Sequence, residues 1–376
     1  MMSDYTPSLT VDLDKIRQNT RYLTGLARER VGAGVFGVTK ALSGSPEVAR
    51  VMLEGGCCGL ADSRFENLRK IRVAMTDWPE FQALPLMLLR IPAPSQVRQV
   101  VETADISLNS EWKTLQLLSQ AAGELRRIHQ IVLMVDLGDL REGIWIDTGN
   151  PSNLISLVRN TLTLPNIKLI GIGTNLACYG GVIPDRAIME RLLKLAFQIE
   201  QVCDYPLEMI SGGNSSAVPM LLDGSMPKGI NSFRLGESIL LGKNVIDRSD
   251  LPGTRQDAMI CRAEIIELQT KPSMPRGVTG QNAFGEQARY IDRGIRQRAI
   301  LALGRQDVVF DGLTPLDPGH IILGASSDHL LVDVSDSRTP LRVGDRILFI
   351  PNYGALLALA TSPYVAKHYV SSDDDR

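Results

Sequence analysis

A chain of 376 residues is long enough for one large domain and a smaller second one, because single hydrophobic cores rarely grow beyond roughly 250–300 residues. Hydrophobic residues make up 44% of the chain and charged residues 22%, which are ordinary globular values and argue against intrinsic disorder. A formal net charge of −2 without a basic stripe argues against nucleic acid as a partner, and no apolar stretch approaches the roughly 20 residues of a membrane-spanning helix.

Up to about residue 240, short apolar runs rich in β-forming residues alternate with longer amphipathic segments. The predicted strands are 35–39, 59–61, 84–89, 106–108, 128–135, 167–174, 207–210 and 232–235. The predicted helices are 14–29, 46–54, 64–74, 94–103, 111–125, 153–161, 186–203 and 216–222. Eight strands separated by helices favour a (β/α)8 TIM barrel, assigned to residues 1–243, over the alternative of a doubly wound sheet.

The pattern changes after about residue 244, where helical periodicity fades and turn residues separate short apolar runs. The strands predicted there are 259–268, 298–303, 320–322, 329–334 and 346–349. We expect residues 244–376 to form a mainly β C-terminal domain. The whole chain is therefore predicted to be an α/β protein in which a barrel precedes a β domain.

Active sites of such barrels lie at the carboxyl ends of the strands, so polar residues at those ends are the first candidates. Lys40 directly follows the apolar predicted strand 35–39. If this environment desolvates the ammonium, the amine becomes a competent nucleophile toward a carbonyl carbon. A lysine at a strand end can also simply reach solvent, and its position alone does not separate the two readings.

Two further segments near strand ends have features of ligand-binding sites. Residues 211–216, Ser-Gly-Gly-Asn-Ser-Ser, combine glycines, hydroxyl donors and a following helix, as phosphate sites do. The same residue types also serve as plain helix caps. Arg234 lies within a predicted barrel strand, where a buried guanidinium needs a planar acceptor such as a ring nitrogen or a phosphate. An ion pair between Arg234 and Glu237 is the alternative.

The cysteines and histidines indicate the compartment and argue against a metal site. Five cysteines are scattered along the chain in an odd number, which is typical of reduced thiols in the cytoplasm. The four histidines form no spacing typical of metal ligands, so no metal is expected. Residues 1–7 lack the apolar core of a signal peptide. We therefore expect a cytoplasmic protein.

Segments along almost the whole chain resemble, in order, the motifs of the alanine racemase superfamily, the fold-type III enzymes that use pyridoxal 5′-phosphate (PLP). These segments are 11–16 with Asn19, 38–41, 137–143, 214–216, 234–237, 327–329 with 332–333, and 344–345 with 352–354. Any one of them is a weak signal, but their order and spacing together are specific. Among subfamilies, residues 212–216, 234–238 and 324–328 most resemble the ornithine racemase branch.

The resemblance implies roles for individual residues. Lys40 would carry PLP covalently and act as one of two catalytic residues, while Arg141 would approach the phenolic oxygen and Arg234 the pyridine nitrogen. The implied cofactor-binding residues are Lys40, Arg141, Asn175, Asn214, Ser215, Arg234, Gly236, Glu237 and Tyr353. The implied substrate-binding residues are Arg141, Ser327 and Asp328.

Three positions depart from the family pattern. Gly44 stands where the family has a tyrosine that contacts the phosphate, and Asn175 stands where it has a histidine that stacks on the cofactor ring. The second catalytic base of the family is a tyrosine of the β domain. The matching segment here, 277–293, offers Tyr290 and Phe284, and Tyr290 is the candidate for that role.

The resemblance implies a PLP-dependent amino-acid racemase, an isomerase of amino-acid metabolism that works as a homodimer. Ornithine or another basic amino acid is the favoured substrate, and its distal ammonium would need an acidic partner such as Asp307, Asp328 or Glu237. Three alternatives remain open, of which a barrel scaffold without a cofactor is the least favoured. A PLP-binding homeostasis protein without turnover would share the barrel but lack the β domain, whereas a fold-type III amino-acid decarboxylase would share both. Neither nucleic acid nor a membrane is an expected partner.

Overall fold

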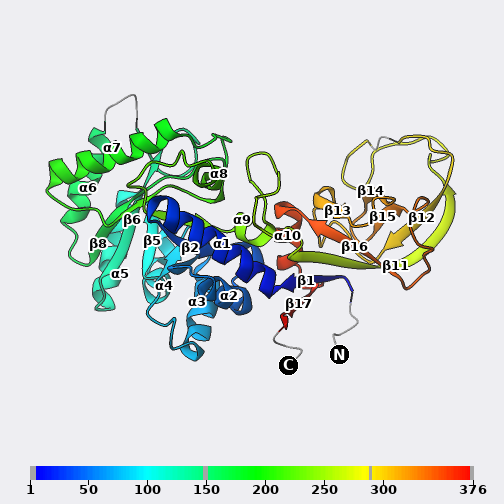
Figure 1. The fold of residues 1–376 in the computed structure, drawn as a ribbon, viewed down its shortest axis with the longest axis horizontal. Coiled ribbons are helices and arrows are strands. Elements are labelled where there is room, and N and C mark those ends of the chain that lie inside the picture. Colours follow the sequence, from blue (N-terminus) through cyan, green and yellow to red (C-terminus); the bar gives the residue numbers. More distant parts are fainter. Residues whose placement is uncertain (1–5, 147–150, 288–289, 373–376) are drawn as a thin grey trace. The chain divides into compact units, whose positions relative to one another are not determined.

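The computed structural model describes residues 6–146, 151–287 and 290–372 of the chain (Figure 1). These residues divide into two compact units. Leu13–Gln256 form the barrel unit, and strand β1 (Ser8–Asp12) together with the chain from Asp257 onward forms the β unit. Within these described ranges, no helix has both the length and the apolar character needed to span a membrane, and no group of three or more His, Cys, Asp or Glu is placed to hold a metal ion.

The barrel unit is built on a closed sheet of eight parallel strands. In sequence order the strands are β2 (Gly34–Val38), β3 (Gly59–Asp62), β4 (Leu86–Leu88), β5 (Ile106–Asn109), β6 (His129–Asp136), β8 (Ile167–Gly173), β9 (Met209–Ser211) and β10 (Ser232–Leu235). They pair in the order β5-β4-β3-β2-β10-β9-β8-β6, and pairing of β5 with β6 closes the barrel. The short β7 (Ile144–Trp145) adds to the end of β6. This confirms the predicted TIM barrel.

Helices connect the strands, as parallel pairing requires. They are α1 (Leu13–Val31), α2 (Pro46–Glu54), α3 (Phe65–Ala74), α4 (Val97–Thr103), α5 (Trp112–Glu124), α6 (Ser152–Leu162), α7 (Arg186–Cys203), α8 (Val218–Leu222) and α9 (Glu237–Leu241). Short 3-10 turns are η1 (Lys40–Leu42), η2 (Met75–Asp77), η3 (Pro94–Gln96) and η4 (Ser215–Ala217). Helix α2 shows the local signals clearly, because the Ser45 hydroxyl accepts a hydrogen bond from the amide of Val48 and proline fills the first turn.

The core of the barrel unit fills the inside of the closed sheet. Alternate residues of one strand point to the same side, and Phe36 and Val38 of β2 share one side with Val132 and Met134 of β6. The other buried members of this cluster are Ala61, Met87, Ile106, Leu108 and Ile170. Apolar side chains thus pack the interior, and the active sites of such barrels lie at the carboxyl ends of the strands.

The β unit is one mainly antiparallel sheet of eight strands. Its strands after β1 are β11 (Met259–Pro272), β12 (Ile295–Leu301), β13 (Leu313–Pro315), β14 (Ile321–Ala325), β15 (Leu330–Asp333), β16 (Arg346–Pro351) and β17 (Ala366–Val370). A 3-10 turn, η5 (Phe310–Gly312), and one helix, α10 (Tyr353–Thr361), complete it. The mainly β character agrees with the prediction, whereas α10 was not expected because its side chains are apolar without a polar stripe.

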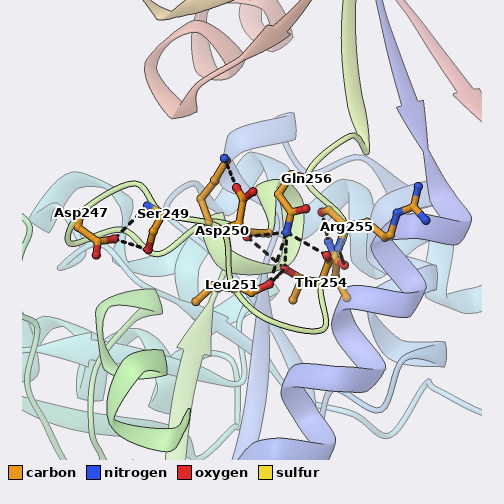
Figure 2. Close-up of polar contacts among 10 residues, drawn as sticks. Asp247, Ser249, Asp250, Leu251, Thr254, Arg255 and Gln256 are labelled. Atoms are coloured by element: carbon orange, nitrogen blue, oxygen red, sulfur yellow. Dashed lines mark hydrogen bonds and ion pairs between the residues drawn. The ribbon is translucent and has the colours of Figure 1, made fainter. Parts of the chain in front are cut away.

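The units divide at a different place from the boundary expected after residue 243. Strand β1 belongs to the β unit because it pairs with β11, with Leu9 opposite Cys261, rather than with a barrel strand. Residues 244–256 belong to the barrel unit instead. Figure 2 shows the polar contacts that hold this segment, in which the Gln256 side-chain amide donates to the carbonyl oxygen of Thr254 at 2.9 Å and to that of Gly242 at 3.3 Å.

Asn19 of α1 fixes the same segment to the barrel unit. Its side-chain nitrogen donates to the carbonyl oxygens of Ile239 and Arg255, both at 2.9 Å, and its oxygen accepts from the amide of Arg255 at 2.6 Å. Asn19 is completely buried, so these three bonds satisfy a polar side chain that would otherwise be costly to bury. Composition alone could not reveal such contacts across more than 200 residues.

Candidate active site

One rim of the barrel brings together the candidate residues that lie in the barrel unit. Parallel strands of a closed barrel all end at the same rim. Residues just beyond the carboxyl ends of β2, β6, β8, β9 and β10 are Lys40, Arg141, Asn175, Asn214, Ser215, Gly236 and Glu237. Arg234 lies within β10. The other candidates, Tyr290, Ser327, Asp328 and Tyr353, belong to the β unit.

Arg234 is a buried guanidinium that, among the described residues, donates hydrogen bonds to neutral acceptors. Only 3% of the residue is exposed. Its Nη1 donates to the Ser211 hydroxyl, and its Nη2 donates to the carbonyl oxygen of Thr174 at 2.8 Å and to Oδ1 of Asn175 at 2.9 Å. Burial lowers the pKa of Arg234 to about 10. The ion pair with Glu237 weighed from the sequence is wrong, because none of these bonds goes to Glu237.

Glu237 instead forms an ion pair with Arg248, which lies in the segment after α9. Burial raises the pKa of the Glu237 carboxyl, while the positive charges of Arg248 and Lys40 oppose that shift.

Lys40 itself is exposed at the start of η1. Its ammonium makes no hydrogen bond or ion pair with the residues that the structure describes. Of the two readings left open from the sequence, the structure shows the one in which Lys40 reaches solvent: β2 is buried, but it ends at Val38, and the side chain of Lys40 lies beyond it. The side chain of Lys40 at the strand end is accessible to a carbonyl compound.

The backbone before Lys40 is held by a buried carboxyl that the sequence analysis missed. Thr39 donates from its hydroxyl to Oδ2 of Asp62, at the end of β3, at 2.7 Å. The other oxygen of Asp62 accepts from the amide of Arg64 and the side chain of Asn67, both at 3.0 Å. Burial raises the pKa of Asp62 despite these donors. Asp62 thus fixes the start of the segment that carries Lys40.

Asn67 also explains the absence of a tyrosine at position 44. Gly44 has a φ of +67°, and a Cβ there would lie 2.5 Å from the Cβ of Asn67 and 2.9 Å from its Cα. Because the Cα cannot move away as a side chain could, a larger residue does not fit at position 44. The side chain of Asn67 takes the neighbouring space.

The loops after β6 and β8 are joined by Asp139, another residue missed from the sequence. Its carboxylate accepts from the backbone amides of Cys178 at 3.1 Å, Tyr179 at 2.9 Å and Val182 at 3.2 Å. Burial alone would raise the pKa of Asp139, but the three amides outweigh it and the pKa is lowered. The sequence signal that could have indicated Asp139 is its position as an acidic residue between Gly138 and Gly143 in a loop.

Arg141, Glu142 and Asn175 form a connected group between these two loops. Arg141 donates from Nη2 to Oε1 of Glu142 at 2.6 Å, and its Nε pairs with Oε2 of the same carboxylate. The side-chain nitrogen of Asn175 also donates to Oε1 of Glu142. Burial lowers the pKa of Arg141, but the bond to Glu142 and nearby negative charges raise it overall. Asn175 therefore connects Glu142 to Arg234.

The segment after β9 is tied to the turn after β10 by Ser215. Its hydroxyl oxygen accepts from the amides of Gly236 and Ser238, both at 3.2 Å, and from the Ser238 hydroxyl at 3.0 Å. Gly213 has a φ of +108°, which a residue with a side chain rarely adopts. Two amides and a hydroxyl thus converge on the Ser215 oxygen, and backbone amides and hydroxyls are the types of donor that phosphate sites use.

The side chain of Asn214 is also hydrogen-bonded within the site and holds the segment after β9 in place. Its Oδ1 caps η4 by accepting from the amide of Ser216 at 2.7 Å, so the helix-capping reading is confirmed for this residue. Its Nδ2 donates to the carbonyl oxygen of Leu176 at 3.0 Å and to Sγ of Cys178 at 3.1 Å. These bonds join the segment after β9 to the loop after β8.

The candidates of the β unit lie on turns, on a loop and at the start of a helix. Ser327 donates to Oδ2 of Asp328 at 2.7 Å in the turn between β14 and β15, and Oδ1 of Asp328 accepts from Gln306 at 2.6 Å. Tyr353 begins α10. Tyr290 is 48% exposed, and it follows residues 288–289, which lie outside the described residues although they belong to the segment 277–293.

Phe284 in that segment is held by a cation. The guanidinium of Arg305 stacks on the Phe284 ring at 4.2 Å and pairs with both oxygens of Glu286 at 2.9 and 2.7 Å. The hydrogen bonds from Arg305 lower the pKa of Glu286 to about 2. Phe284 is therefore fixed against Arg305, and it has no group that can exchange a proton.

Comparison with known proteins places this architecture in a family. The model of the alanine racemase N-terminal domain matches residues 11–243. An ornithine racemase from Acetoanaerobium sticklandii is 41% identical over 361 residues, which cover 96% of this chain and 99% of that protein. A lysine racemase from Thermotoga maritima is 36% identical over 366 residues, which cover 97% and 99%. The solved alanine racemase from Streptomyces coelicolor A3(2) has a TM-score of 0.73 at 19% identity, covers 96% of this chain and 97% of its own, and shares the fold.

Proposed function

The chain belongs to the alanine racemase family, and from that premise we propose that it is a PLP-dependent racemase of a basic amino acid, with ornithine favoured. The two curated relatives support this proposal because both are named as racemases of basic amino acids and both match nearly the full length of the chain. The match includes the β unit, which a protein made of the barrel alone would lack.

The observation that carries the proposal is the position of Lys40. It follows the carboxyl end of β2 with an exposed amine, at the rim where Arg234 and Ser215 also lie. A lysine that holds an aldehyde cofactor needs a free amine at a strand end of this rim. We propose that Lys40 binds the PLP aldehyde covalently.

The residues of the rim fit the remaining groups of PLP. Ser215 and the amides near Gly236 form a donor set suited to the phosphate, and we propose that Asn214 and Glu237 shape this region. The buried Arg234, with only neutral protein acceptors, suits the ring nitrogen. We assign Arg141 to the phenolic oxygen and Asn175 to the ring, with Tyr353 of the β unit contributing to the phosphate.

When bound, PLP withdraws electrons from the substrate and acidifies its Cα–H bond. Racemisation then requires removal of a proton from one face of Cα and its return on the other. We propose that the Lys40 amine serves one face. Tyr290 is the candidate for the other, because its phenol can exchange a proton whereas the ring of Phe284 cannot. Its exposure leaves the phenol accessible.

A positively charged Arg234 at the ring nitrogen would keep that nitrogen unprotonated and so favour return of the proton over other reactions. Arg141 is also assigned to the substrate carboxylate, together with Ser327 and Asp328 of the β unit. The acidic partner of the distal ammonium is assigned among Asp307, Asp328 and Glu237. Of these, Asp307 already accepts from Ser362 at 2.7 Å in the β unit.

We also propose a cytoplasmic homodimer. All five cysteines are free thiols, as expected in a reducing compartment. The dimer is inferred from family membership, and sedimentation equilibrium of the purified protein tests it directly.

The experiment that tests the function is chiral chromatography of single L-amino acids incubated with purified protein and PLP. The panel contains ornithine, lysine, arginine, alanine and serine. We expect D-ornithine or D-lysine to accumulate with the wild type and not with Lys40→Ala. Lys228→Ala is the matched control, because Lys228 is an exposed lysine before β10, at the opposite rim. Carbon dioxide release would indicate a decarboxylase, and bound PLP without any turnover would indicate a homeostasis protein.

A further inference from the structure

The carboxylate of Glu142 is shared by two side chains of the rim. Both of its oxygens engage the guanidinium of Arg141, with Oε1 accepting from Nη2 at 2.6 Å and Oε2 pairing with Nε. Two-point contact with a planar guanidinium fixes its orientation as well as its position. Oε1 also accepts from Nδ2 of Asn175.

A carboxylate at this position determines which way the Asn175 amide points. An ionised carboxylate can only accept hydrogen bonds, so the amide nitrogen of Asn175 must face Glu142. The amide oxygen then faces the other way, where it accepts from Nη2 of Arg234 at 2.9 Å. A neutral amide in place of Glu142 could donate or accept and would not fix this polarity.

The same carboxylate affects Arg234 through its charge. The side chain of Glu142 is only 17% exposed, so its charge is weakly screened by water. The negative charge of Glu142 raises the pKa of Arg234 and partly opposes the effect of burial, whereas the positive charge of Arg141 acts in the opposite direction. Glu142 thus contacts the guanidinium of Arg141 directly and favours the charged form of both arginines.

We propose that Glu142 is a positioning residue that orients Arg141 directly and Arg234 through Asn175. The inference rests on the proposed function in so far as these two arginines serve the cofactor. Glu142 itself touches neither the cofactor nor the substrate in this account. Its role is to hold Arg141 through a direct two-point contact and Arg234 through the Asn175 amide.

The first test needs no cofactor. Phenylglyoxal modification of individual arginines, followed by mass spectrometry, measures how freely each guanidinium reacts. We expect Glu142→Gln to raise the modification rate of Arg141 several-fold. Glu190→Gln is the matched control, because Glu190 pairs with Arg186 in an exposed contact on α7 and its loss should leave Arg141 unchanged. An unchanged rate at Arg141 in Glu142→Gln overturns the proposal.

The second test measures PLP affinity by fluorescence titration and the pH dependence of the visible absorbance of bound PLP. We expect Glu142→Gln to weaken PLP binding by about tenfold, the effect of losing a hydrogen bond to a charged group, and to shift the absorbance profile. Glu142→Asp, which keeps the charge, should recover part of both. Melting temperatures identify any variant that fails to fold.

A double-mutant cycle tests the path through Asn175. If Glu142 acts on Arg234 through Asn175, then Glu142→Gln combined with Asn175→Ala should weaken PLP binding by less than the product of the two single effects. Additive effects overturn that path. If the wild type binds no PLP, the proposed function fails, and the arginine modification rates still decide whether Glu142 holds Arg141.

Discussion

The side chain of Arg234 donates to Oδ1 of Asn175 at 2.9 Å, and this bond joins β10 to the end of β8 at the rim of the barrel. The bond gives the buried guanidinium a neutral acceptor. The nitrogen of the same Asn175 amide donates to the carboxylate of Glu142. The rim is therefore a connected polar layer above an apolar barrel interior.

Replacing Arg234 by lysine removes the planar fork that reaches Ser211, Thr174 and Asn175 together. We expect Arg234→Lys to weaken PLP binding by about tenfold or more, because contacts to a charged group are lost. Fluorescence titration with PLP measures the loss. Arg186→Lys, a change at an exposed arginine of α7, should bind PLP like the wild type, and equal binding by both variants would contradict the role of Arg234.

Replacing Asp139 by asparagine should lower the free energy of unfolding by about 1–3 kcal/mol, because one amide oxygen cannot accept all three backbone amides that the carboxylate holds. The pKa of Asp139 is lowered in the folded protein, so its contribution is present at neutral pH and is lost as the pH falls through that lowered pKa. Urea unfolding at pH 7 and in acid measures both effects. A variant as stable as the wild type at pH 7 would contradict the account.

The site itself was only partly predictable from the sequence. Lys40, Arg234 and the segment 211–216 follow apolar runs that mark strands, and the strand-end rule then places them on one rim. Glu142 and Asp139 were missed because the sequence does not distinguish an acidic residue that bonds to another loop from one that is exposed to solvent. Both residues lie in the loop after β6, and their partners in the loop after β8 are known only from the structure. The ion pair between Glu237 and Arg248 could not be predicted either, because the sequence does not show which charges come into contact.

The fold was more predictable than its boundaries. Eight buried strands separated by amphipathic helices are a periodic signal, and they specify the barrel. Strand β1 has a similar apolar pattern, yet it pairs with β11, which is about 250 residues away in the sequence, and only the register of Leu9 opposite Cys261 reveals this. The apolar helix α10 was missed because it has no polar stripe to set its period.

His129 supplies a prediction about pH. Its side chain is buried against the Ser107 hydroxyl at 2.8 Å, and burial lowers its pKa to about 4. The unfolded chain binds a proton near the ordinary value of 6.5 and the folded protein does not, so stability falls as the pH drops from 6.5 toward 4. The expected slope from this residue is about 1.4 kcal/mol per pH unit. His129→Gln should flatten the profile measured by urea unfolding, and an unchanged slope would count against this assignment.

Gly44 and Asn67 give a prediction about steric fit. Gly44→Ala should lower the free energy of unfolding by more than the ~1 kcal/mol cost of a positive φ, because the new methyl group would also meet the backbone of Asn67. Gly224→Ala is the matched control, since its φ of +78° is similar but no atom lies within 4 Å of the added Cβ. Equal losses of stability in the two variants would show that Asn67 does not restrict position 44.

The most direct measurement of the central claim is proton NMR of L-ornithine in D2O with purified protein and PLP, combined with chiral analysis of the same sample. We predict that the Cα hydrogen is replaced by deuterium while the mixture approaches equal amounts of the two isomers. Lys40→Ala should show neither change, and Lys228→Ala should behave as the wild type does. Exchange that persists in Lys40→Ala, or a wild type that leaves both ornithine and lysine unchanged, would contradict the account.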